Sequence, residues 1–187
     1  LRPVPFLHAD RLVDVLDTNH KRGGGGNNLT PEKVAGWQAQ PALFERFEAF
    51  MPAQFDVKGD VEPERISGWH VSVGLFDMLG VAPRAGRNFT AGDGRPGGER
   101  LAIISDDIWR RRFGAHPDAL GRAIVLNDEP YTIVGIMPRR FRLHSEKDAV
   151  WLPVDIAASR GQASLNGFYG IGRLAPGVAM ANAKPLA

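Results

Sequence analysis

The residues of this chain that could do chemistry are few, and the most suggestive group is Ser105 followed directly by Asp106 and Asp107. A serine among carboxylates could act as a nucleophile, but it would need a base such as histidine within hydrogen-bonding reach. A helix start explains these residues more simply, because serine caps backbone N–H groups and carboxylates favour the positive end of the helix dipole. The G-x-S-x-G pattern of a nucleophile elbow is also missing. We therefore predict a helix cap here, no catalytic residues, and a protein that is not an enzyme.

The histidines offer no obvious metal site. No two of them lie three or four residues apart, the spacing that would place both on one face of a helix, and the chain has no cysteine. Without thiolates or a histidine pair, the sequence predicts no bound metal. The five histidines are His8, His20, His70, His116 and His144.

Two glycine-rich stretches could suggest a phosphate-binding loop. Gly92–Gly97 matches G-x-G-x-x-G, but Pro96 and further glycine leave no helix N-terminus for a phosphate. Gly23–Gly26 lacks the lysine and serine that follow the glycines of a P-loop. We predict surface loops at both places and expect no cofactor.

Arginines cluster at residues 110–112 and again at residues 139–142. Basic side chains with interleaved aromatic residues are typical of nucleic-acid binding. Trp109 and Phe113 lie four residues apart, however, and are expected on the core-facing side of a helix. The net charge of +2 is also small. We expect no nucleic-acid partner, and predict that Arg110, Arg111 and Arg112 point largely toward solvent and form a candidate partner-contact surface.

The segment from Leu101 to Pro138 contains the elements that would position these arginines. Leu101–Ile104 is a continuous apolar run of the kind found in buried strands. Ser105 then begins a helix that Gly114 is suited to end. Ala123–Pro138 has the pattern of a β-hairpin.

Further elements are expected in the first part of the chain. Thr30 and Pro31 are a typical cap and first helical residue. Leu43, Phe44 and Phe47 have the spacing of one face of a short helical turn. A strand through residues 50–57 is expected to return beside a first strand at residues 11–17.

The remaining elements complete the prediction of fold class. Ser72 is expected to cap a helix that Gly80 ends. Val150–Val154 is predicted as a strand that Pro153 confines to a sheet edge. Strands, helices and hairpins alternate irregularly, which favours an α+β fold over a doubly wound parallel sheet.

Length and composition fit this prediction. A chain of 187 residues corresponds to one domain or two small ones, at roughly 100–200 residues per domain. It is 43% hydrophobic and 24% charged, which is ordinary for a globular protein. It contains no apolar run of the roughly 20 residues that span a bilayer. The unusual start at Leu1 leads us to expect a part of a longer protein.

Several blocks, in their order and spacing, resemble the MacB-like periplasmic core domain of FtsX-like ABC transporter permeases of the acidobacterial type. Each block alone is short, but together they cover nearly the whole chain. The blocks are Leu1–Phe6 with Asp10–Val13, Arg65–Ser72 with Phe76–Val81 and Gly86–Phe89, Ser105–Gly114 with Gly121–Arg122 and Val134–Pro138, and Val150–Pro153 with Arg173–Val178.

The resemblance implies two interleaved mixed α/β subdomains. Residues 1–61 and 166–187 would form a porter-like subdomain, the second part truncated, and residues 62–165 an inserted sabre-like subdomain. It also implies a position on the periplasmic side of the bacterial cytoplasmic membrane, between two membrane helices.

The function implied is non-catalytic. The domain would relay ATP-driven conformational change across the membrane for export or mechanotransmission. Implied partners are a cytoplasmic ATP-binding subunit or domain, acting through the membrane helices, a second copy of the permease, and a periplasmic partner protein. An alternative is a periplasmic module that binds or senses a peptide, lipid or lipoprotein in an apolar cleft. A third, a hydrolase, lacks the cluster of reactive residues that it needs.

Overall fold

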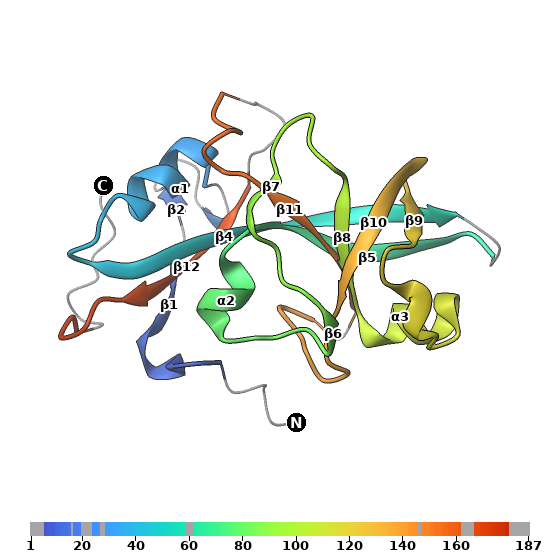
Figure 1. Cartoon of the computed structure of the whole chain (residues 1–187). Coiled ribbons are helices and arrows are strands. Elements are labelled where there is room, and N and C mark those ends of the chain that lie inside the picture. Colours follow the sequence, from blue (N-terminus) through green and yellow to red (C-terminus); the bar gives the residue numbers. More distant parts are fainter. Residues whose placement is uncertain are drawn as a thin grey trace.

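The computed structural model describes residues 6–15, 17–19, 24–26, 29–58, 62–145, 147–161 and 167–179. Within these ranges the chain forms a nine-stranded mixed sheet, with helices packed against it, and a separate two-stranded sheet (Figure 1). The large sheet has the order β1-β12-β4-β5-β11-β8-β10-β6, and β9 pairs with both β10 and β4. The pairs β5–β11 and β8–β10 are parallel, and the other pairs are antiparallel. The predicted α+β class is therefore confirmed.

The elements have the following bounds. The strands of the large sheet are β1 (Leu12–Val15), β4 (Phe44–Lys58), β5 (Glu64–Ser72), β6 (Ala85–Gly86), β8 (Leu101–Ile104), β9 (Ala123–Leu126), β10 (Glu129–Ile136), β11 (Asp148–Val154) and β12 (Tyr169–Leu174). Outside it lie β2 (Asp17–Asn19), β3 (Gly24–Gly26) and β7 (Ala91–Gly94). The helices are α1 (Pro31–Gln38), α2 (Leu75–Leu79) and α3 (Asp106–Phe113), with 3-10 turns at Ala9–Arg11 and Pro117–Ala119.

Strand β4 is the spine of the sheet. Its 15 residues span roughly 45–50 Å at about 3.3 Å per residue. The first half pairs with β12, the second half pairs with β5, and its last residues, Val57 and Lys58, pair with β9. Because β9 also pairs with β10, the six strands β4, β5, β11, β8, β10 and β9 close on themselves.

Apolar residues fill both faces of the central strands. In β8 all four residues are buried, and alternate side chains enter different clusters. Leu101 and Ile103 pack with α2, whereas Ala102 and Ile104 pack with α3 and the inner residues of the closed strands. A third cluster joins α1 to β4 and β12. The continuous apolar run therefore forms a doubly buried strand.

Helices α1 and α3 begin as the sequence predicts. Thr30 caps α1, its side chain accepting from the backbone N–H of Lys33, and Pro31 is the first helical residue. The Ser105 side chain accepts from the N–H of Ile108 at 3.2 Å, and Gly114 ends α3 in the left-handed conformation. The predicted helix cap at Ser105 is therefore confirmed.

The predicted helical turn at Leu43, Phe44 and Phe47 is wrong, because Phe44 opens β4. A β-bulge opposite β12 inserts one residue between Phe44 and Arg46. The extra residue puts Phe44 and Phe47 on the same side of a strand at a spacing that a helix would also produce. The strand at residues 50–57 is present, but β12 separates it from β1.

Two other local predictions are also corrected. Val150–Val154 is not at an edge, since β11 lies between β5 and β8. The pairing with β8 involves only Val150 and Trp151, so Pro153 lies beyond it and costs no hydrogen bond to that strand. Ser72 does not cap α2. It ends β5, while Gly80 does end α2 at φ 70°.

The glycine-rich stretches are only partly loops. Gly92 and Gly94 belong to β7, and Gly97 and Gly98 lie in the turn after it. Gly24–Gly26 pairs with Asp17–Asn19 in the small sheet, and the rest of that predicted loop lies outside the described residues.

Candidate partner-contact site

The predicted contact residues lie on α3, at the end of the sheet opposite β1 and β12 (Figure 1). The local sequence builds this end of the molecule in three steps. The buried strand β8 ends at Ile104, the next residue, Ser105, caps α3, and Ile108 and Trp109 anchor the helix in the core. The three arginines therefore follow a helix turn that its cap and its buried side chains hold in place.

Arg110 is tied to a buried carboxylate one turn earlier. Its Nε donates to Asp106 at 2.7 Å, and Arg84 pairs with the same carboxylate while its guanidinium lies 4.5 Å from the centre of the Trp109 ring. Burial by itself would raise the pKa of Asp106. The hydrogen bonds and charges of Arg110 and Arg84 outweigh it and hold this pKa below its ordinary value.

Arg111 and Arg112 both reach Glu64 at the start of β5. Arg111 donates to Asp107 at 2.7 Å and to Glu64 at 3.1 Å, and Arg112 donates to Glu64 at 3.0 Å. The side chain of Arg112 is only 6% exposed. The prediction that all three arginines point largely toward solvent is therefore wrong for Arg112, because a carboxylate 48 residues earlier covers it.

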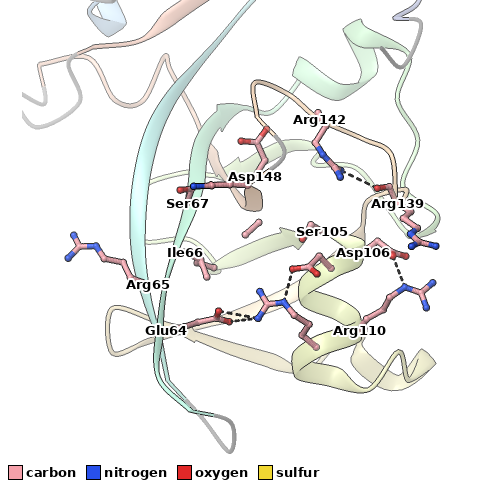
Figure 2. Close-up of a pocket in the computed structure, with 14 residues that line it drawn as sticks. Glu64, Arg65, Ile66, Ser67, Ser105, Asp106, Arg110, Arg139, Arg142 and Asp148 are labelled. Atoms are coloured by element: carbon pink, nitrogen blue, oxygen red, sulfur yellow. Dashed lines mark hydrogen bonds and ion pairs between the residues drawn. The ribbon is translucent and has the colours of Figure 1, made fainter. Parts of the chain in front are cut away.

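A cleft of about 540 Å³ opens beside α3. Figure 2 shows α3 on one side of it and the segment with Arg139 and Arg142 on the other. The structure thus brings Ser105, Asp106, Arg110 and Arg111 together with the second arginine cluster, whereas Arg112 does not line the cleft. The full lining is Glu64, Arg65, Ile66, Ser67, Ser105, Asp106, Asp107, Arg110, Arg111, Arg139, Arg142, Lys147, Asp148 and Ala149.

The segment opposite α3 is organised by Asp148, a residue that sequence reasoning missed. This carboxylate is 4% exposed. It accepts from the backbone N–H groups of Leu143, His144 and Ser145 at 2.8–3.1 Å, and from Trp69 Nε1 at 2.8 Å. An aspartate opening an apolar strand after a polar run is the signal that could have pointed to it.

The described histidines do not meet at a site, and His20 lies outside the described residues. His116 caps the turn at Pro117–Ala119, and His144 packs its ring against Trp69 and Tyr169. His70 lines a second cleft, of about 260 Å³, where burial lowers its pKa. Among the described residues, no group of three or more His, Cys, Asp or Glu side chains is placed to hold a metal ion.

Both clefts carry several charged side chains. They differ in this respect from the apolar cleft that a lipid or peptide sensor would present. No helix in the described ranges is long and apolar enough to cross a membrane.

The chain is similar to one protein family over nearly its whole length, and to solved structures of related proteins. Residues 3–185 match the family model described as the MacB-like periplasmic core domain. The fold resembles the periplasmic region of MacB from Actinobacillus actinomycetemcomitans, with a TM-score of 0.68 at 12% identity, covering 91% of this chain and 76% of that one. It also resembles the extracellular domain of the noncanonic ABC-type transporter YknZ from Gram-positive bacteria, with a TM-score of 0.65 at 16% identity, covering 87% and 83%.

One curated relative matches a shorter stretch. The sequence is 28% identical over 87 residues to a Pseudomonas fluorescens (strain Pf0-1) protein named "Probable export ATP-binding/permease protein". That match covers 46% of this chain and 13% of the relative, so the chain corresponds to a small part of the longer protein.

Proposed function

The chain belongs to the MacB-like periplasmic core domain family, and on that premise we propose that it relays ATP-driven conformational change across the membrane, for export or mechanotransmission. It would do so without catalysis of its own. The energy would come from a cytoplasmic ATP-binding subunit or domain, acting through membrane helices.

The observation that best supports this proposal is the pairing of β1 with β12. The two strands are antiparallel, with Leu12 opposite Arg173 and Val15 opposite Gly170. The start of β1 and the end of β12 therefore lie at the same end of the molecule. Two membrane helices joined to these ends would enter and leave the domain together, and would move neighbouring strands.

The sheet offers a path for such motion. β12 pairs with the first half of β4, and β4 continues to the end of the sheet near α3. A displacement applied at β1 and β12 would pass to β4 through the hydrogen bonds between these strands, and then along the covalent backbone of β4, as in a rigid lever. We propose that the periplasmic partner protein contacts the α3 end and that two copies of the permease form the working unit.

The two-part division of the domain is also part of this proposal. Residues 1–61 and 166–187 would be the part next to the membrane, and residues 62–165 the part that reaches the partner. The α3 end and both walls of its cleft belong to the second segment.

Cysteine labelling in the full-length permease would test the position of the domain. The chain has no cysteine, so Arg95→Cys, at a side chain 68% exposed, would introduce a single reactive thiol in a permease from which any cysteine outside this segment has been removed. We expect a membrane-impermeant maleimide to label it in intact cells, after the outer membrane is permeabilised, as fully as after lysis.

Ile104→Cys is a matched control, because that side chain is fully buried and should react only after denaturation. Labelling of Arg95→Cys that appears only after lysis would contradict the proposal. So would ATP binding to the isolated chain, measured by calorimetry.

A further inference from the structure

The cleft beside α3 has two walls of different electrostatic character. We propose that it binds a carboxylate-rich segment of a partner protein, and that Arg139, Arg142 and Lys147 are the residues that bind it. This inference rests on the proposed extracytoplasmic position, and it moves the contact from the predicted arginines of α3 to the wall opposite them.

The positive charges of Arg110 and Arg111 on the α3 wall are largely neutralised by carboxylates of the same chain. Arg110 is paired with Asp106, and Arg111 with Asp107 and Glu64, at distances of 2.7–3.1 Å. A carboxylate arriving from outside would have to compete with these ion pairs. The gain from such an exchange is small, because one charge-assisted hydrogen bond replaces another.

The opposite wall has cations without a carboxylate partner among the described residues. Arg142 donates only to the carbonyls of Arg139 and Phe141, at 3.1 and 2.6 Å. The side chains of Arg139 and Lys147 face the same cleft and make no ion pair with a described residue. Of the charged residues that line the cleft, six are cationic and four are acidic, so the excess is positive and is concentrated on this wall.

This wall is held in place before any ligand arrives. Asp148 gathers three consecutive backbone N–H groups, and His144 packs on Trp69 at 5.3 Å between ring centres. A prearranged site loses little conformational entropy on binding. Guanidinium groups also match carboxylates through paired hydrogen bonds.

The mixed lining favours a protein segment over a dense polyanion. Glu64, at the start of β5, and Asp107, on α3, also line the cleft, with side chains 30% and 68% exposed. They would repel a phosphate-rich ligand or an anionic membrane at close range. A peptide with dispersed carboxylates can place them against Arg139 and Lys147 and turn its amide groups toward the acids.

Fluorescence anisotropy with the 187-residue chain would test this inference. The probes are two labelled synthetic peptides, one alternating Glu with Gly and the other Gln with Gly. We expect the Glu peptide to bind in a salt-sensitive manner and the Gln peptide not to bind. The double variant Arg139→Gln/Lys147→Gln should weaken binding by about tenfold.

The double variant Arg95→Gln/Arg160→Gln is the matched control. It removes the same charge from exposed positions outside the cleft, and should change affinity by less than about twofold. Equal melting temperatures would show that both variants are folded.

Three results would overturn the proposal: equal binding of the two peptides, equal weakening by the two double variants, or displacement of the Glu peptide by inorganic phosphate or phosphatidylglycerol vesicles at matched anion concentration. The last result would make the cleft a general anion site. None of them bears on the labelling test, and a failed labelling test leaves these affinities unchanged, so the two proposals fail separately.

Discussion

At Glu48 burial and charge oppose each other. This β4 residue is 8% exposed and accepts a hydrogen bond from Ser72 Oγ at 2.5 Å, while Arg46 lies 3.7 Å away. Burial raises the pKa of the Glu48 carboxyl, and the hydrogen bond from Ser72 and the charge of Arg46 offset this only in part. The Ser72 hydroxyl, which also accepts from the N–H of Ala49, therefore serves this carboxyl rather than a helix.

The variant Glu48→Gln should be more stable than the wild type at neutral pH. Since the folded state holds the Glu48 proton more tightly than the unfolded chain, the stability it contributes is present below the ordinary carboxyl pKa and is lost as the pH rises through the raised pKa. The amide carries no charge and avoids this loss. We expect a gain on the order of 1 kcal/mol at pH 7, or about 2–4 °C in Tm, that disappears near pH 4.

Thermal melts of both proteins between pH 4 and 8 would measure this difference. Glu99→Gln, at an exposed position, should stay within about 0.5 kcal/mol of wild type across the range. A Glu48→Gln variant that is less stable than wild type at pH 7 would refute the account.

At the scale of elements, the packing of β12 requires two positions without a side chain. Gly170 and Gly172 lie on the same face of the strand, where the rings of β4 cross it. A Cβ at Gly172 would lie 2.3 Å from the Phe44 ring, and one at Gly170 would lie 2.6 Å from the Phe47 ring. The two rings pack on each other at 5.2 Å and on Trp37 of α1. The bare strand thus lets the aromatic cluster reach the backbone.

Gly172→Ala should destabilise the chain by about 2 kcal/mol, because the added methyl group overpacks a closed aromatic cluster. Gly36→Ala is the opposite case, since it lies in α1 with no atom within 4 Å of its added Cβ. It should stabilise the chain by about 0.5–1 kcal/mol through helix propensity. Urea titrations would give both values. A Gly172→Ala variant as stable as wild type would contradict this prediction, because it would show that the aromatic rings can shift to accommodate the methyl group.

At the scale of the whole molecule, the proposed lever requires that the sheet move as one body. Asp14 on β1 and Asp56 near the end of β4 are both exposed, and two strand pairings connect them. Spin labels on Asp14→Cys and Asp56→Cys would report the length of the lever in the full-length permease. We expect the distance between them to be the same with and without ATP.

The label pair must be diluted among cysteine-free copies, so that only distances within one copy are measured. A single Asp14→Cys label in every copy should report a distance between copies that does change with ATP. If the distance within one copy changes as much as the distance between copies, the domain bends and the relay mechanism is wrong.

Local signals in the sequence were sufficient for many elements. Ser105, Thr30 and Gly80 act within one turn of their own position, and the Asn127–Asp128 turn of the predicted hairpin has both residues at positive φ. The comparisons also confirm the family that the ordered blocks indicated.

Features that depend on distant partners were not predictable. The bulge at Phe44 exists only against β12, and the burial of Arg112 depends on Glu64. The charged cleft requires α3 to face Arg139, Arg142 and Lys147, which no spacing within either segment encodes. The positions of both arginine clusters were visible in the sequence. Which arginines form ion pairs with carboxylates, and which do not, depends on how the fold places those carboxylates.

The pairing of β1 with β12 also constrains how the chain can assemble. Strand β1 and the first half of β4 both pair with β12, so neither can complete its pairing until β12 has been synthesised. Such distant partners are typical of slow folding, since a long loop must close before any contact stabilises it. Until β12 is in place, β1 and the first half of β4 present open edges that can associate with other chains. Completion of this part of the sheet therefore depends on β12, which joins β1 to β4.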